Sequence, residues 1–160
     1  KSRHYYRESC ELCGSAVGVE PVAVIHDGGF PSGFINFMAQ RHYRNVWVDA
    51  HMDHPYGRKI DVAGPSGVRR LVDAHKRALN DAARTGMPVM VGKWSSALPL
   101  SDAQMTPEGR IALERVYTSE QLEAYAACPA WFFSTWKTSG LLTSWDARMA
   151  LSSSVRGTIV

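Results

Sequence analysis

The sequence predicts an α/β protein with a parallel sheet, and three observations lead to this fold class. Short apolar segments of strand length alternate along the chain with segments of helical periodicity. The apolar segments are continuous, which is typical of strands buried on both faces. Polar and aromatic residues follow each of them, as expected where parallel strands end together at one edge. The chain of 160 residues suffices for one domain with a core.

The first half of the chain is predicted to hold two helix–strand pairs. An amphipathic helix at 3–17 precedes a strand at 21–27, which closes in polar residues and two glycines. A short helix at 32–40 leads to a second strand at 45–51. A loop rich in proline, glycine and charge follows.

The second half is predicted to hold three helices and two strands. Apolar residues recur at helical spacing over 68–82, and Gly86 followed by Pro88 ends that helix. Thr118 and Gln121 have the spacing of a capping box, so we expect the next helix to begin there and run to about residue 127. The two strands and a short closing helix are expected at 89–92, 130–136 and 145–151.

The composition excludes several classes of protein. The net charge is +3 without a block or stripe of basic residues, so we expect no nucleic-acid partner. No apolar run approaches the roughly 18 residues of a membrane span. Cys10 and Cys13 form a C-x-x-C at helical spacing, which favours core packing over redox chemistry. The chain begins at Lys1 without a signal-peptide pattern, so we expect a processed product or a piece of a longer protein.

Residues with chemical function follow every predicted strand. Because the strands are parallel, we expect these side chains to meet in one pocket. The candidate substrate-binding residues are His26, Asp27, His51, Asp53, Tyr56, Trp94 and Trp136, and Lys93 lies beside Trp94.

Each candidate also has a simpler structural explanation. Trp94 and Trp136 either stack on sugar rings or pack beneath the strand ends, whereas Trp47 and Trp131 lie mid-strand and are expected in the core. Lys93 either occupies a functional position or forms an ion pair with a neighbouring aspartate, Asp27 or Asp53. The histidines and aspartates have metal-ligand chemistry, but their spacing matches no known ligand motif, so we expect no metal and no cofactor.

Four motifs in order resemble one enzyme family. They are VIHDGGF, NVWVDAHMDH, PVMVGKWSSAL and AWFFSTWKTSG. Together they resemble the second half of family 5 glycoside hydrolases, and most closely the exo-β-1,3-glucanases of fungi. The resemblance covers nearly the whole chain. It implies a (β/α)8 barrel with two catalytic glutamates in a retaining mechanism. Residues 1–160 would then form a single half-barrel-like domain equivalent to barrel strands five to eight.

The resemblance also implies that catalysis is impaired. Lys93 stands at the position of the family's nucleophilic glutamate, and the acid/base glutamate belongs to a strand that would precede this chain. A cation at Lys93 opposes the positive charge of an oxocarbenium-like transition state. Asp53 stands where the family has tyrosine, whereas His51 and Trp136 match family positions. The resemblance therefore implies a β-glucan-binding domain or pseudoenzyme that is secreted or associated with the cell wall.

Four strands are too few to close such a barrel, which takes about 250 residues. Four strands leave two sheet edges and an apolar inner face open. We expect either an open, doubly wound layer or a half-barrel that associates with itself or with a missing N-terminal half. Two other functions remain open: a protein-interaction module that keeps only the fold, and a metal-dependent hydrolase that uses the His/Asp cluster.

Overall fold

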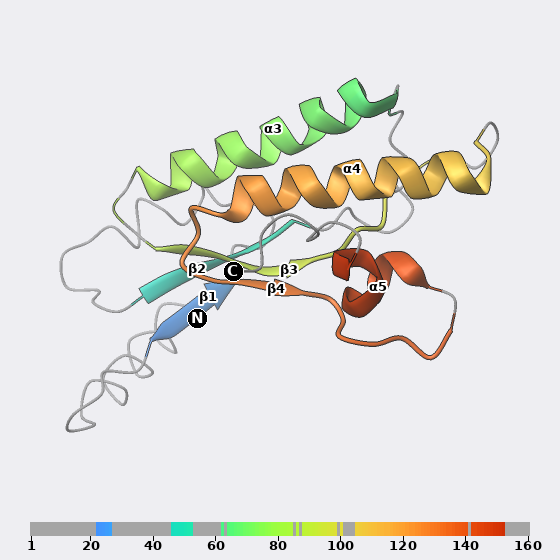
Figure 1. Cartoon of the computed structure of the whole chain (residues 1–160). Helices are drawn as coiled ribbons and strands as arrows, with labels where there is room; N and C mark the ends of the chain where they lie inside the picture. The colour runs from blue at the N-terminus through green and yellow to red at the C-terminus, as the bar shows by residue number, and fades with distance from the viewer. Residues whose placement is uncertain are drawn as a thin grey trace.

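In the part of the chain that the structure describes, four strands form one sheet and all of them are parallel (Figure 1). The computed structural model describes residues 22–26, 46–52, 62, 64–84, 86, 88–98, 100, 105–140 and 142–152. The strands are β1 (Ala23–His26), β2 (Val46–His51), β3 (Val89–Trp94) and β4 (Trp131–Phe133). The predicted α/β class with parallel βα units is confirmed, and the four described strands do not close into a barrel.

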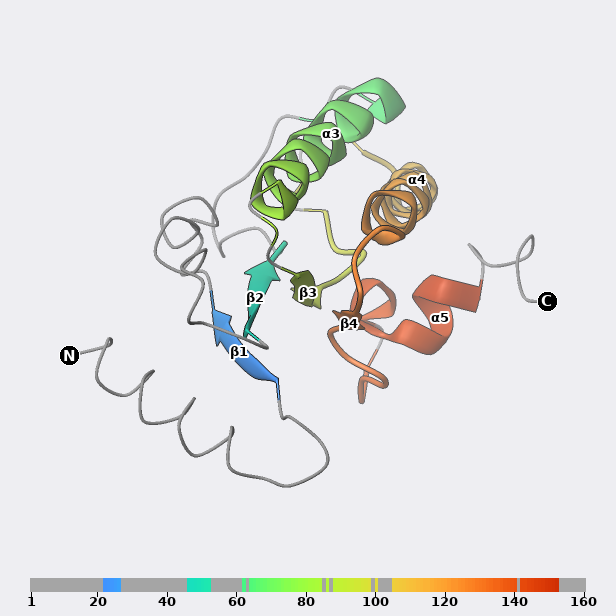
Figure 2. The same cartoon turned by 90° about the vertical axis from the view of Figure 1, so that its left-hand side faces the viewer.

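Two long helices cover one face of this sheet. They are α3 (Gly64–Ala83) and α4 (Pro107–Tyr125), which pack side by side above the strands (Figures 1 and 2). A 3₁₀ turn, η2 (Thr143–Trp145), and the short helix α5 (Ala147–Ser152) lie beyond β4 (Figure 2). In the part of the chain that the structure describes, no helix is both long and apolar enough to cross a membrane.

The strand order in the sheet is the same as the order in the sequence, β1-β2-β3-β4. A doubly wound sheet reverses its strand order at a switch point, whereas a barrel adds each strand beside the previous one. The described strands therefore have the arrangement of a barrel segment. This order is compatible with the half-barrel expected from the sequence, and the half-barrel stays a prediction.

Burial alternates along β2 and identifies the two faces of the sheet. Val46, Val48 and Ala50 are buried toward the helices, whereas Trp47, Asp49 and His51 on the other face are only partly covered. Alternation of this kind marks a sheet with one face on the core. No described helix packs on the second face, which we call the inner face because it would line a closed barrel.

The structure corrects three of the predicted elements. The helix expected to begin at Thr118 begins at Pro107, because Thr106 caps it and its hydroxyl accepts a hydrogen bond from the Gly109 amide at 3.1 Å. β3 runs two residues further than expected, and β4 has only three residues. Trp131 is 38% exposed, because it lies on an edge strand and not in the core. The helices expected at 3–17 and 32–40 lie outside the described residues.

Candidate functional site

The carboxyl ends of the four strands bring several predicted site residues to one edge of the sheet, which we call the strand-end edge. His26 ends β1, His51 ends β2, and Lys93 is the last residue but one of β3. Trp136 follows β4 by three residues. Parallel pairing of all four strands places these ends on the same side of the sheet, as the sequence predicts.

His26, His51 and Asp49 form a compact cluster on neighbouring strands. The rings of His26 and His51 meet edge to face with their centroids 4.0 Å apart. The Nε2 atom of His51 lies 3.2 Å from Oδ2 of Asp49 and donates a hydrogen bond to it. This bond fixes the orientation of the imidazole and leaves its Nδ1 as the second polar atom.

Asp49 is a site residue that the sequence-based prediction missed. It lies inside a predicted strand, two residues before His51, so period-two geometry places both side chains on the inner face. An aspartate among the apolar residues of that strand is the signal that identifies it. Its Oδ1 atom is buried and has no hydrogen-bond partner among the described residues.

Gly92 makes room for the Asp49 carboxylate. A Cβ atom at Gly92 would lie 1.8 Å from Oδ1 of Asp49 and 2.4 Å from its Cγ, far inside van der Waals contact. The strand pairing is irregular at this point, because His51 pairs with Lys93 whereas Ala50 pairs with Val91. The extra residue in β3 has the character of a β-bulge, a feature that often re-aims side chains beside functional sites.

Lys93 is half-buried next to His51 across the β2–β3 pair. Its carbonyl oxygen accepts a hydrogen bond from the Met52 amide at 2.9 Å, which extends the pairing beyond the end of β2. The expected ion-pair partners, Asp27 and Asp53, lie outside the described residues, as does Tyr56. The ion pair expected at Lys93 therefore stays a prediction.

Trp94 lies in the core in this structure. Its side chain is 0% exposed and packs edge to face against Tyr125, Trp131 and Phe133, with ring centroids 4.9 to 5.4 Å apart. A fully enclosed indole presents no face on which a sugar could stack. Of the two explanations for Trp94, the geometry supports core packing.

Helix α4 holds the segment that follows β3. The Gln121 side-chain amide donates to the Ser95 carbonyl at 3.1 Å, and the Tyr125 hydroxyl donates to Gln121 Oε1 at 3.0 Å. Burial raises the pKa of Tyr125, which keeps its hydroxyl protonated for this bond. Arg110 donates to the Leu98 carbonyl at 3.2 Å. These contacts fix the chain immediately after Lys93 and Trp94, and with it the position of Lys93.

Trp136 has the most exposed side chain among the described tryptophans and phenylalanines, at 72%. Its loop is attached to the segment after it by two backbone hydrogen bonds, from Thr135 N to Trp145 O at 2.9 Å and from Ala147 N to Thr135 O at 3.0 Å. The peptide bond between Ser134 and Thr135 is cis. An open indole on an anchored loop at the strand ends is suited to stacking on a flat apolar ligand face.

The metal-dependent alternative has no support in the described part of the chain. Among those residues, no group of three or more His, Cys, Asp or Glu side chains is arranged to hold a metal ion. Asp27, Asp53 and His54, which the hypothesis also needs, lie outside them.

No protein-family model matches this sequence, and no curated protein matches it either. The resemblance to family 5 glycoside hydrolases therefore depends on the four sequence motifs, and the structure adds the fold class.

Proposed function

We propose that this chain is a β-glucan-binding domain of family 5 glycoside hydrolase type that does not hydrolyse its ligand. The observation that carries the proposal is the exposed indole of Trp136 at the strand-end edge, beside β4 and on the same side of the sheet as His26 and His51. Aromatic faces bind the C–H-rich faces of sugar rings, and imidazoles bind sugar hydroxyls.

The expected lack of hydrolysis follows from the charges at this edge. A retaining glycosidase needs two carboxyl groups about 5 Å apart, one as nucleophile and one as acid/base. Lys93 occupies the position that the family resemblance assigns to the nucleophile. The described carboxylate nearest to it in the strand pairing, Asp49, is held by His51 and enclosed against Gly92. A carboxylate that is hydrogen-bonded to His51 and packed against Gly92 is poorly placed to attack a sugar carbon.

Replacing Trp136 by alanine tests the binding site. We expect the variant to bind a β-1,3-glucan hexasaccharide about tenfold more weakly, because it loses the stacking surface. Calorimetric titration measures the change. Val22→Ala is the matched control. Val22 is also an exposed apolar residue, but it precedes β1 and so lies at the amino-terminal ends of the strands, away from Trp136. Equal affinity of the two variants would rule Trp136 out of the site.

A second role, association with another chain, is favoured by apolar residues exposed on both edge strands. Val24 on β1 is 49% exposed and Phe132 on β4 is 55% exposed. Among the described residues, β1 and β4 are the outer strands of the sheet, and outer strands with exposed apolar side chains are templates for pairing. We infer that the partner is a second copy of this chain or an N-terminal half-barrel.

Sedimentation at micromolar concentration tests this association. We expect the chain alone to form an oligomer. Phe132→Lys should shift the equilibrium toward the monomer, because burying a lysine ammonium in an apolar interface costs free energy. Leu142→Lys is the control, since Leu142 is exposed outside the sheet. A monomer for the unmodified chain would leave only the N-terminal half-barrel as partner.

A further inference from the structure

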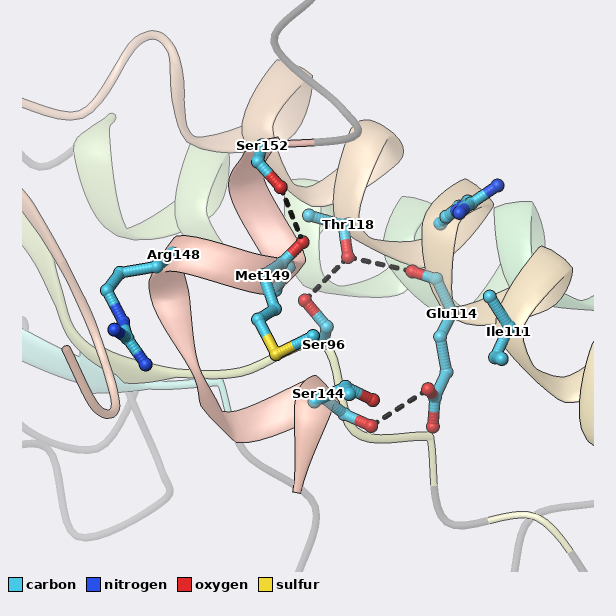
Figure 3. A pocket seen from close by; sticks show the side chains of 11 residues that line it. Ser96, Ile111, Glu114, Thr118, Ser144, Arg148, Met149 and Ser152 are labelled. Carbon is cyan, nitrogen blue, oxygen red and sulfur yellow. Dashed lines mark hydrogen bonds between the residues drawn. The ribbon is translucent and has the colours of Figure 1, made fainter. Parts of the chain in front are cut away.

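A pocket of about 360 Å³ opens between α4, η2 and α5 (Figure 3). Its volume lies in the range of small-molecule sites. None of His26, His51, Lys93 and Trp136 lines it, so it is separate from the strand-end edge. The ligand of this pocket can therefore be inferred independently of the proposed glucan binding.

The floor of the pocket is rich in hydroxyl groups. Ser96 and Thr118 are buried, and their oxygens lie 2.6 Å apart in a hydrogen bond. Thr118 Oγ1 also lies 2.7 Å from the Glu114 carbonyl oxygen, a second acceptor. Each hydroxyl has one proton and two lone pairs, so a group bonded in this way offers more acceptors than donors. A ligand on the floor can therefore donate hydrogen bonds to these oxygens.

Glu114 forms one wall and is itself buried. Its Oε2 accepts a hydrogen bond from Ser144 Oγ at 2.8 Å (Figure 3). Its Oε1 accepts a hydrogen bond from Arg110 Nε at 3.2 Å. The carboxylate retains lone pairs beyond these two bonds, because each oxygen accepts more than one. Its charge repels an anionic ligand and favours a ligand that donates hydrogen bonds.

Two arginines also line the pocket. Arg148 is bound through two hydrogen bonds to Asp146, at 2.8 and 3.1 Å. Arg115 is exposed and has no hydrogen-bond or ion-pair partner among the described residues. These guanidinium groups oppose a cationic ligand and offer donors to a neutral oxygen.

Two apolar side chains complete the pocket. Ile111 from α4 and Met149 from α5 lie on opposite sides of it (Figure 3), and both are about half exposed, at 45% and 52%. A ligand between them needs apolar C–H faces as well as polar groups. We propose that this pocket binds a neutral polyol of the size of one sugar unit, whose hydroxyls donate to Glu114 and Ser96 and whose C–H faces pack against Ile111 and Met149.

Methyl resonances of methionine provide a local test with the whole chain. We expect D-glucose to shift the Met149 methyl signal saturably, with a dissociation constant of roughly 1 mM, and to leave the Met90 methyl on β3 unchanged. Trp136→Ala should leave the Met149 response intact. No saturable shift of Met149, or a shift that disappears in Trp136→Ala, would overturn the proposal and would say nothing against glucan binding at the strand ends.

Two variants test the assigned contacts. Glu114→Gln keeps the side-chain shape but loses its charge, so we expect about tenfold weaker glucose binding, with Glu108→Gln on the exposed first turn of α4 as the control. Ile111→Ala, at an exposed position that folding tolerates, should weaken binding about threefold. Unchanged glucose affinity in Ile111→Ala would overturn the proposed site. A Met149 methyl shift with acetate or methylammonium as large as the shift with glucose would also overturn it.

Discussion

At the scale of single residues, the absence of a side chain at Gly92 on β3 leaves room for the Asp49 side chain of β2. The Asp49 carboxylate occupies the volume in which any side chain at position 92 would begin. The sequence marks Asp49 through its place in a predicted strand, but it cannot give this contact. The neighbour of Asp49 depends on the β2–β3 register, which is irregular at that point and is not encoded in either segment alone.

Substitution of Gly92 by alanine should destabilise the fold. We expect a loss of about 1 to 3 kcal/mol in the free energy of unfolding, because the added methyl group overlaps the carboxylate of Asp49. Asp49→Ala removes the obstacle, so the double variant should be more stable than the sum of the two single losses predicts. Urea unfolding of the four proteins measures the coupling. Additive losses would place the two residues out of contact.

The start of α4 shows at the scale of elements what local sequence can and cannot decide. Thr106, Pro107 and Gly109 provide a side-chain cap and a first-turn proline, which is a helix start that the sequence already contains. The capping-box spacing at Thr118 is a weaker signal, because Thr118 instead lies inside the helix and bonds the Glu114 carbonyl at 2.7 Å. Burial decides at which of these two positions the helix begins. Thr118 is buried and its hydroxyl is hydrogen-bonded to Ser96, so it cannot cap a helix end.

Asp146 connects helix α5, through Arg148, with the loop after β4, through Thr138. We expect these hydrogen bonds to weaken in acid, when the Asp146 carboxylate is protonated. It accepts hydrogen bonds from the Arg148 side chain and from the Thr138 amide, which lower the pKa of Asp146 to about 2. Since this pKa lies below the ordinary value of 3.8, its stabilising contribution is present above about pH 4 and is lost as the pH falls toward 2. The bond to Thr138 anchors the loop that carries Trp136.

The variant Asp146→Asn tests this connection. We expect lower stability than the unmodified protein at neutral pH and a smaller loss between pH 4 and pH 2, because the titrating group is gone. Asp73→Asn on the exposed surface of α3 is the control. Urea unfolding across this range measures both effects. A variant that loses stability in acid as steeply as the unmodified protein would assign the titration to another group.

At the scale of the whole molecule, the sequence predicts the parallel sheet and the edge at which its strands end. Continuous apolar segments identify all four strands, and the side chains after them locate His26, His51 and Trp136 at a common edge. The exposure of Trp131 and the burial of Trp94 could not be predicted, because edge and centre strands have the same composition and differ only in their neighbours. The order of strands follows from pairing, which also depends on the complete fold.

The titration of the unmodified chain with β-1,3-glucan hexasaccharide tests most directly the proposal that this chain binds a glucan without cleaving it. Calorimetry records both events, since binding gives heat that saturates and hydrolysis gives sustained thermal power. Because Lys93 stands where the resemblance places the nucleophilic carboxylate, we expect binding without hydrolysis. The heat should then saturate and return to the baseline after each injection. Sustained power that a substitution in this chain abolishes, or the absence of any saturable heat, would contradict glucan binding without hydrolysis.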